Sequence, residues 1–318
     1  MRVEPTRRSL TNHFVHRGGF YSSEEELLAI AVPIVEDALS RELPVAVICS
    51  AHTEGALHDV LGGSAGLIHL PPPEEHLRRS GQAVITRRAR ELRELTDWAG
   101  SLEVIAEHHP RRPGIDPVAW VEAEAAMNVA LAMLPITMTC LYPTGHGAKA
   151  ADAVRWNHSR LIEVGGVVRD NLEVRTPGDV LTERPAPAPV DLGLPHLKMS
   201  FTPWQLIELR GAVADAISGV ELAGDQAQDF VLAVNEVASN AVEHGNSVGE
   251  LHIWRNDHEL VCEVHNTGPL SEPLPGLRPP HPSSTRGRGM WIARQLCDLL
   301  HVWTDVHGTH VRLQTSRR

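Results

Sequence analysis

The stretch Glu236-Val-Ala-Ser-Asn240-Ala-Val-Glu-His244-Gly245 places a carboxylate, a carboxamide and an imidazole at steps of four residues. On an α-helix this spacing lines Glu236, Asn240 and His244 along one stripe. The other stripe is apolar, so the helix can pack on a core while the polar stripe faces a cleft. Carboxylate and carboxamide oxygens suit a Mg²⁺-phosphate site, and a carboxylate can also deprotonate a hydroxyl. The apolar stripe consists of Phe230, Val231, Val234, Val237, Ala238, Ala241 and Val242.

A glycine-rich turn follows this helix further along the chain. After Asn266-Thr-Gly268-Pro269 comes a long loop of Pro, Ser and Gly that ends in Arg286-Gly287-Arg288-Gly289-Met290. The Gly-x-Gly predicts the start of an apolar helix over Trp291–Leu300, where free backbone N–H groups and the helix dipole favour a phosphate. Alternating polar and apolar residues predict strands at 250–256, 259–265, 301–305 and 309–315.

The order of these elements over about 200–318 resembles the GHKL ATPase family, and more narrowly the RsbW-type anti-sigma serine kinases. The resemblance implies an α+β sandwich that binds ATP and Mg²⁺. It also implies a role for each matching position. Glu236 would be the general base, Asn240 the Mg²⁺ ligand, Asn266 and Gly268 the adenine-recognition turn, Gly287 and Gly289 the end of the phosphate-binding lid, and Gly308-Thr309 the closing turn.

Two positions depart from the family pattern. Asn266 stands where the family has an adenine-binding aspartate, and Leu270 replaces the second glycine of that turn. An amide oxygen can still accept a hydrogen bond from the adenine amino group, but neutral bonds contribute about 0.5–1.5 kcal/mol against about 1.5–3 kcal/mol for charged ones. We therefore expect nucleotide affinity to be about tenfold lower, or lost altogether.

Several residues near the site have simpler structural interpretations. His244 fits a nucleotide contact and fits equally well a cap on the last carbonyl groups of the helix. Gly245 is expected to be the left-handed residue that ends the helix. Cys262 and Cys297 lie in apolar runs and are expected to be small core residues.

Composition limits the remaining classes of function. The chain has 318 residues, enough for two domains, and neither an apolar run of membrane-spanning length nor a secretion signal, so we expect a cytoplasmic protein. A net charge of −11 argues against a broad surface for binding nucleic acid.

Arginines over 78–93 alternate with Glu91 and Glu94 and indicate a solvated helix face. The four cysteines and the scattered histidines have no metal-ligand spacing, so the sequence predicts reduced thiols and no metal beyond Mg²⁺.

A boundary between two domains is predicted at 177–198. Arg184-Pro-Ala-Pro-Ala-Pro-Val and Leu194-Pro195 indicate a stiff, polyproline-like linker. Thr202-Pro203 then predicts a helix start, with Thr202 as the N-cap. The predicted domains are residues 1–176 and residues 199–318.

The first domain alternates helix-like and strand-like segments, which indicates an α/β fold with a parallel sheet. It resembles the MEDS sensory domain in Gly19-Phe20-Tyr21-Ser22-Ser23-Glu24-Glu25-Glu26-Leu27, Trp120-Val-Glu-Ala-Glu124, Thr139-Cys-Leu-Tyr142 and Asn157-His158. The resemblance implies a RecA-like fold, yet Ala51-His52-Thr53-Glu54-Gly55 stands where a Walker motif would follow the strand Val45–Cys49. We therefore expect a sensory domain without phosphate hydrolysis.

The ligand of this first domain stays open. Its polar side chains could converge at the strand ends, where open α/β sheets bind ligands, or could simply be packing and backbone partners. The candidates are Tyr21, Glu122, Glu124, Asn128, Tyr142 and His158.

The two resemblances together imply an anti-sigma regulatory protein. The expected reaction is transfer of the ATP γ-phosphoryl group to Ser or Thr of a STAS-type anti-anti-sigma protein. The same domain would bind a sigma factor, and a small-molecule or protein signal would act on the first domain. Such kinases tend to dimerise. The alternative is a degenerate GHKL module that sequesters its partner without catalysis. A histidine kinase is disfavoured, because 203–218 supplies one helix without a phospho-acceptor histidine.

Overall fold

The computed structural model describes residues 14–63, 66–72, 80–109, 116–145, 147–281, 283–284 and 287–317. The chain divides into two compact units. Unit 1 takes the described residues of Met1–Pro72, Arg90–Arg111 and Leu131–Val174, and unit 2 takes those of Pro73–Ala89, Arg112–Ala130 and Arg175–Arg318. Within the described ranges, every helix is too short or too polar to cross a bilayer.

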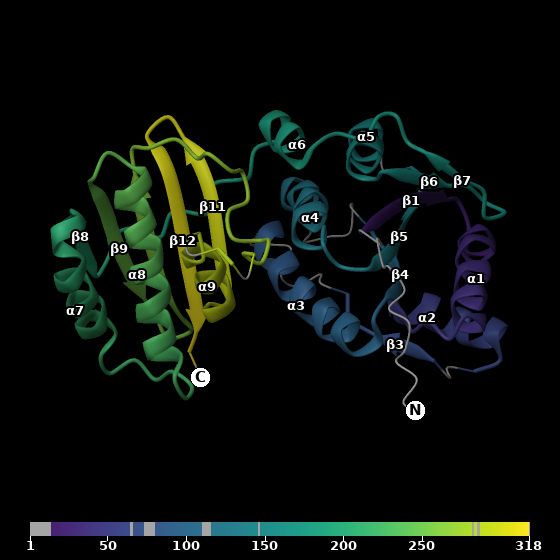
Figure 1. Cartoon of the computed structure of the whole chain (residues 1–318), viewed down its shortest axis with the longest axis horizontal. Coiled ribbons are helices and arrows are strands. Elements are labelled where there is room, and N and C mark those ends of the chain that lie inside the picture. The colour runs from purple at the N-terminus through teal and green to yellow at the C-terminus, as the bar shows by residue number, and fades with distance from the viewer. Residues whose placement is uncertain are drawn as a thin grey trace, which may run out of the picture. The chain divides into compact units, whose positions relative to one another are not determined.

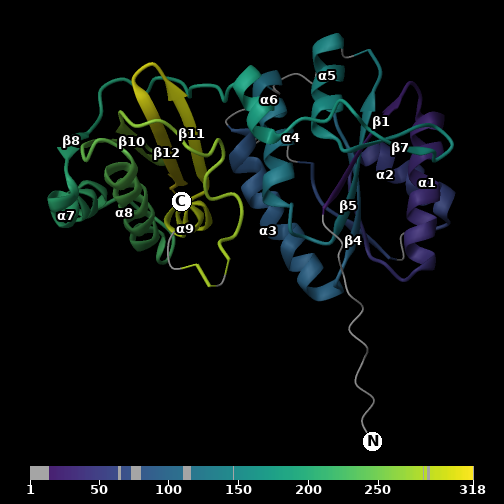
Figure 2. The same ribbon diagram turned by 45° about the horizontal axis from the view of Figure 1, so that its top comes forward.

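Unit 1 is built on a seven-stranded sheet in the order β3-β2-β4-β5-β1-β6-β7. All neighbouring strands are parallel except the β6–β7 pair. This mainly parallel sheet confirms the predicted α/β class. In Figure 2, α1 and α2 lie on the same side of the sheet. The strands are β1 (Val15–Tyr21), β2 (Val45–Ile48), β3 (Leu67–His69), β4 (Leu102–Glu107), β5 (Ile136–Pro143), β6 (Arg160–Ile162) and β7 (Val168–Asp170), and the helices are α1 (Glu24–Ser40), α2 (Ala51–Leu61) and α5 (Ala148–Asn157).

Local signals account for most of these elements. Ser23 caps α1 by accepting the backbone N–H of Glu26. The central strand β1, however, is not evident from the sequence, since Gly18-Gly19 weakens its β propensity. Parallel neighbours on both sides stabilise it. The helix α5 ends at Asn157, because Arg160–Ile162 pairs with β1.

Unit 2 contains a five-stranded antiparallel sheet in the order β11-β12-β10-β9-β8. Three helices, α7, α8 and α9, cover one face of it (Figure 1), which confirms the predicted α+β class. The buried stripe of α8 faces a core that also contains Cys262 and Cys297. The elements are β8 (Leu197–Phe201), a 3₁₀ turn (Pro203–Gln205), α7 (Leu206–Ile217), α8 (Gln226–His244), β9 (Gly249–Arg255), β10 (Glu259–Asn266), α9 (Gly289–Leu296), β11 (Leu299–Asp305) and β12 (Gly308–Ser316), together with α4 (Pro117–Ala130) and α6 (Pro177–Glu183).

Three predictions about unit 2 are wrong in detail. The predicted linker contains α6, whose N-cap Thr176 accepts from the backbone N–H of Asp179. The predicted helix from Trp291 ends at Leu296, because Leu299 and Leu300 pair with β12. Gly245 is extended rather than left-handed, with φ of −94°. Close packing explains that glycine, since a Cβ there would lie 2.8 Å from Cβ of Asn266.

The helix α3 (Gly81–Ala99) carries the arginine-rich segment and belongs by its first half to unit 2. Arg87 and Arg90 are exposed, as a solvated face predicts, whereas Arg88 is buried. Arg78 and Arg79 lie outside the described residues. The solvated-face prediction is therefore wrong for Arg88.

A buried polar network lies within unit 2 around Arg294 of α9. This guanidinium donates to Gln82 Oε1 at 2.7 Å, to the Leu300 carbonyl at 3.0 Å and to the Pro275 carbonyl at 2.8 Å. Gln82 donates in turn to Glu122 Oε1 at 2.7 Å. Burial lowers the pKa of Arg294 to about 10, and Glu122 offsets part of this effect, so the guanidinium stays charged at neutral pH.

Candidate functional site: a cavity beside the Glu/Asn/His helix

A cavity of about 200 Å³ lies in unit 2 beside the polar stripe of α8. Its walls come from α8, from the ends of β10 and β12, from the loop after β10 and from the start of α9. Five of the predicted site residues line it, namely Asn240, His244, Asn266, Gly287 and Thr309. Apolar side chains complete the wall, as is usual in pockets that bind small molecules. They include Val237, Leu270, Met290, Val302 and Val311.

Glu236 and Asn240 lie one helical turn apart and both face the start of α9. A Cβ built on Gly289 would lie 2.6 Å from Glu236 Oε2 and 3.0 Å from Asn240 Nδ2. Any side chain at position 289 would therefore displace the carboxylate. The glycine lets the N-terminus of α9, with its free N–H groups, come directly against the carboxylate–carboxamide pair.

Asn266 at the end of β10 forms a tight turn with Gly268. Its Oδ1 accepts the Gly268 backbone N–H at 2.7 Å. A backbone N–H can only donate, so this contact fixes the orientation of the carboxamide. The oxygen keeps a second lone pair, so it can still accept from another donor. Its expected contact with an adenine amino group stays a prediction.

Thr309 fixes the same turn from the other side. Its buried hydroxyl donates to the Gly268 carbonyl at 2.8 Å, and Thr309 pairs with Asn266 across the β10–β12 ladder. His244 at the end of α8 is exposed and also lines the cavity, so its position allows the nucleotide contact. All eight predicted site residues thus lie in or beside one cavity, while the chemical role of each stays a prediction.

The types of side chain around the cavity suit a nucleotide with bound Mg²⁺. A carboxylate and a carboxamide stand beside a glycine turn at a helix start, and an apolar wall adjoins them. The size fits less well, because small-molecule sites usually measure about 300–1,000 Å³. Binding a whole nucleotide therefore requires the cavity to widen.

The candidate ligand residues of the first domain do not form one group in unit 1. Tyr142 lines a second cavity, of about 370 Å³, at the ends of β1 and β5. Tyr21 lies elsewhere and donates to Glu107 at 2.9 Å. Burial raises the Glu107 pKa, but hydrogen bonds, first from His109, outweigh it and hold the value at about 2. Glu122, Glu124 and Asn128 lie on α4 in unit 2.

His158, by contrast, lies beside two side chains of types that can bind a metal ion. The sequence did not indicate this group. His16, Cys140 and His158 come together in unit 1 although they lie far apart along the chain. Burial and the neighbouring His16 lower the pKa of His158 well below its ordinary value, so the ring is neutral. The three residues come together because β1 pairs with β5 and α5 ends beside them. Their spacing along the chain gives no local signal of this group.

Comparison with known families identifies both parts of the chain. Residues 199–315 match the model of the histidine kinase-like ATPase domain. Residues 15–159 match the model of the MEDS domain, the methanogen/methylotroph, DcmR sensory domain. The chain therefore carries a histidine kinase-like ATPase domain together with a MEDS domain, as the two resemblances in the sequence predict.

Whole-chain similarity is weaker. Among solved structures, the RsbU and RsbW domains of Rv1364c from Mycobacterium tuberculosis align at 18% identity and a TM-score of 0.27. The alignment covers 42% of this chain and 35% of that one, so it carries no argument about function. No curated protein matches the chain.

Proposed function

We propose that the ATPase domain binds ATP with Mg²⁺ and phosphorylates a serine or threonine of a STAS-type anti-anti-sigma protein. The observation that carries this proposal is the grouping of Glu236 and Asn240 against Gly289, beside the cavity that Asn266 and Thr309 line. The match to a histidine kinase-like ATPase domain supports ATP as the ligand. The resemblance of the motif order to RsbW-type kinases supports the protein substrate.

Each residue has a defined task in the proposed reaction. Glu236 accepts the proton of the attacking hydroxyl, whose oxygen forms the new bond to the γ-phosphorus as the bond to ADP breaks. The oxygen of Asn240 would hold Mg²⁺, which offsets phosphate charge when bound. The N–H groups at the start of α9 face the phosphates. Asn266 and Thr309 orient the base.

The proposed biological role is anti-sigma regulation. The ATPase domain would bind a sigma factor directly, and phosphorylation of the STAS antagonist would leave it free to do so. The MEDS domain would supply the input signal. A cytoplasmic location and a homodimer remain predictions that accompany this role.

A second candidate is a sequestration module without catalysis. One observation favours it: the cavity of about 200 Å³ is small for a nucleotide. Both candidates predict the same fold and the same protein partners. They differ in phosphoryl transfer.

The test is incubation of the full chain with γ-labelled ATP, Mg²⁺ and the STAS proteins encoded beside it. We expect label on the STAS protein, and a loss of about 10²-fold or more in Glu236→Gln with nucleotide binding intact. Glu243→Gln, at an exposed position of the same helix, is the matched control and should keep full activity. Equal transfer by Glu236→Gln would remove Glu236 from the mechanism. Nucleotide binding without transfer to any STAS protein would favour sequestration.

A further inference from the structure

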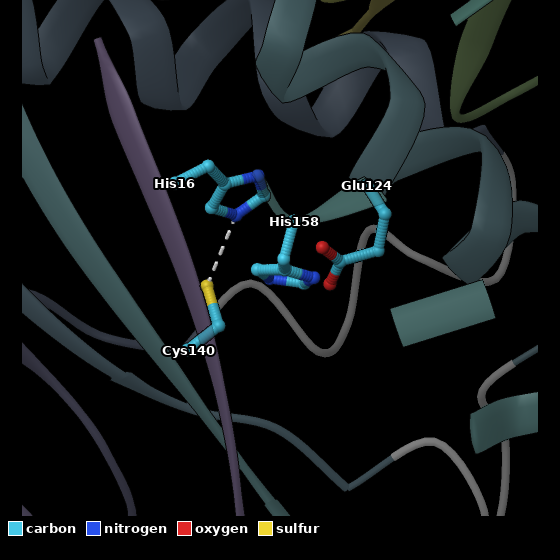
Figure 3. A group of neighbouring side chains, drawn as sticks. All are labelled: His16, Glu124, Cys140 and His158. Carbon is cyan, nitrogen blue, oxygen red and sulfur yellow. Dashed lines mark hydrogen bonds between the residues drawn. The ribbon is translucent and has the colours of Figure 1, made fainter. Parts of the chain in front are cut away.

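Three buried side chains of unit 1 meet on one face of its sheet. Figure 3 shows His16 of β1, Cys140 of β5 and His158, which follows α5, close to one another, with His16 directed at the Cys140 sulfur. Their exposed fractions are 1%, 0% and 0%. Their ligand atoms lie within 4.8 Å of one another, and His16 Nε2 is 3.3 Å from Cys140 Sγ.

These separations suit a tetrahedral metal ion. Zinc bonds of about 2.0–2.1 Å to nitrogen and about 2.3 Å to sulfur place neighbouring ligand atoms about 3.3–3.6 Å apart. The His16–Cys140 distance of 3.3 Å is already close to this range. The other separations, which are at most 4.8 Å, would have to shorten by up to about 1.3 Å to close on an ion.

Both imidazoles are held in the tautomer that can ligate through Nε2. His16 Nδ1 is 3.2 Å from the Asn157 carbonyl, and His158 Nδ1 is 2.7 Å from the Val154 carbonyl. A carbonyl oxygen only accepts, so each Nδ1 carries the hydrogen and each Nε2 keeps its lone pair. Metal-ligating histidines commonly donate their second N–H to such carbonyls, which orients the ring.

Gly18 provides the space for this arrangement. It pairs with Cys140 in the β1–β5 register, and a Cβ at this position would lie 2.9 Å from Cγ of His158. The Tyr142 hydroxyl lies 3.4 Å from His158 Nε2, where it is the donor, since Nδ1 holds the ring hydrogen. A bound ion would replace this long contact.

We propose that His16, Cys140 and His158 form a binding site for a thiophilic divalent transition metal, with zinc as the first candidate. Two imidazole nitrogens and one thiolate are a donor set that zinc prefers, and three protein ligands leave a fourth position open to water or a small ligand. Binding displaces the thiol proton of Cys140, which passes to solvent. Glu124, also drawn in Figure 3, belongs to unit 2, and the proposal does not use it.

The test uses the full chain, stripped with a chelator and titrated with Co²⁺ as a spectroscopic substitute for zinc. We expect about one equivalent to bind, with a sulfur-to-cobalt charge-transfer band, and zinc to displace the cobalt. Cys140→Ser should abolish the band. His158→Gln should lower the metal affinity more than about a hundredfold, since loss of an outer-shell partner alone costs about 10–100-fold.

Two controls separate this site from other ligands in unit 1. Cys49→Ser removes another buried thiol and should leave the band unchanged. His69→Ala removes one member of the more exposed group Glu54, His58 and His69 and should also leave it unchanged. Circular dichroism checks that each variant is folded. A stripped wild-type chain that gives no thiolate band with Co²⁺, or a folded Cys140→Ser variant that keeps the band, would overturn the proposal.

Discussion

Asn266 decides what the base end of the cavity offers to a nucleotide. Its Oδ1 accepts the Gly268 N–H at 2.7 Å and keeps one lone pair for a second donor. The amino group of adenine is such a donor. The wild-type turn therefore offers adenine a neutral oxygen that is shared with Gly268, and this bond is weaker than one to a carboxylate.

Asn266→Asp should strengthen the contact with the adenine amino group. One carboxylate oxygen keeps the contact with Gly268, and the second becomes an ionised acceptor for the adenine amino group. We expect ATP to bind about fivefold more tightly, or about 1 kcal/mol, and inosine triphosphate to bind more weakly than to wild type. Calorimetry on both proteins measures this directly.

The matched control is Asn246→Asp, which adds the same charge at an exposed position in contact with Thr267. It should leave the order of the two nucleotides unchanged. If Asn266→Asp shifts neither affinity, Asn266 does not contact the base.

At the scale of elements, the first half of α3 and the helix α9 depend on one buried residue. The side chain of Gln82 is fully buried. Its oxygen accepts hydrogen bonds from Arg294 at 2.7 Å and from the Val302 N–H at 3.1 Å. Its nitrogen donates to Glu122 and to the Val302 carbonyl. Gln82→Leu removes all four contacts and leaves a buried guanidinium with fewer partners. We expect a loss of about 3 kcal/mol in the free energy of unfolding.

Urea denaturation of the full chain measures this loss. Gln228→Leu, at an exposed position of α8, is the matched control and should change stability by less than about 0.5 kcal/mol. A Gln82→Leu protein as stable as the control would show that Arg294 is satisfied without Gln82.

Local patterns account for the elements that the sequence could predict. The four-residue spacing of Glu236, Asn240 and His244 is a property of one helix, so their common stripe follows from the sequence alone. The backbone conformation of Gly245 does not follow from the sequence, because it depends on packing against Asn266 of a later strand. The length of α9 likewise depends on pairing between Leu299–Leu300 and β12. The group of His16, Cys140 and His158 could not be predicted from the sequence either, because long-range strand pairing brings its members together.

At the scale of the whole molecule, the predicted boundary at 177–198 differs from the division into compact units. The described residues of 73–89 and 112–130 group with 175–317 in unit 2. The hydrophobic core of the ATPase domain nevertheless lies entirely between Phe201 and Leu313. The apolar cluster under α1 lies between Tyr21 and Ile162.

We therefore expect fragments 1–176 and 199–318 each to fold when expressed alone. The second should be less stable than in the full chain, because Arg294 and Val302 lose Gln82. Circular dichroism and urea denaturation of each fragment test this. A fragment 199–318 that is unfolded or insoluble would show that the boundary is misplaced.

The central claim is that the cavity beside α8 binds ATP with Mg²⁺ through Asn240. Its most direct test is the calorimetric affinity of the full chain for ATP with and without Mg²⁺, in wild type and in Asn240→Ala. Asn256→Ala, at an exposed position outside the cavity, is the control. We predict that Mg²⁺ tightens binding to wild type and to the control, and that Asn240→Ala keeps only the Mg²⁺-free affinity. A wild-type chain that binds no ATP, or binds it equally well without Mg²⁺, would contradict the claim.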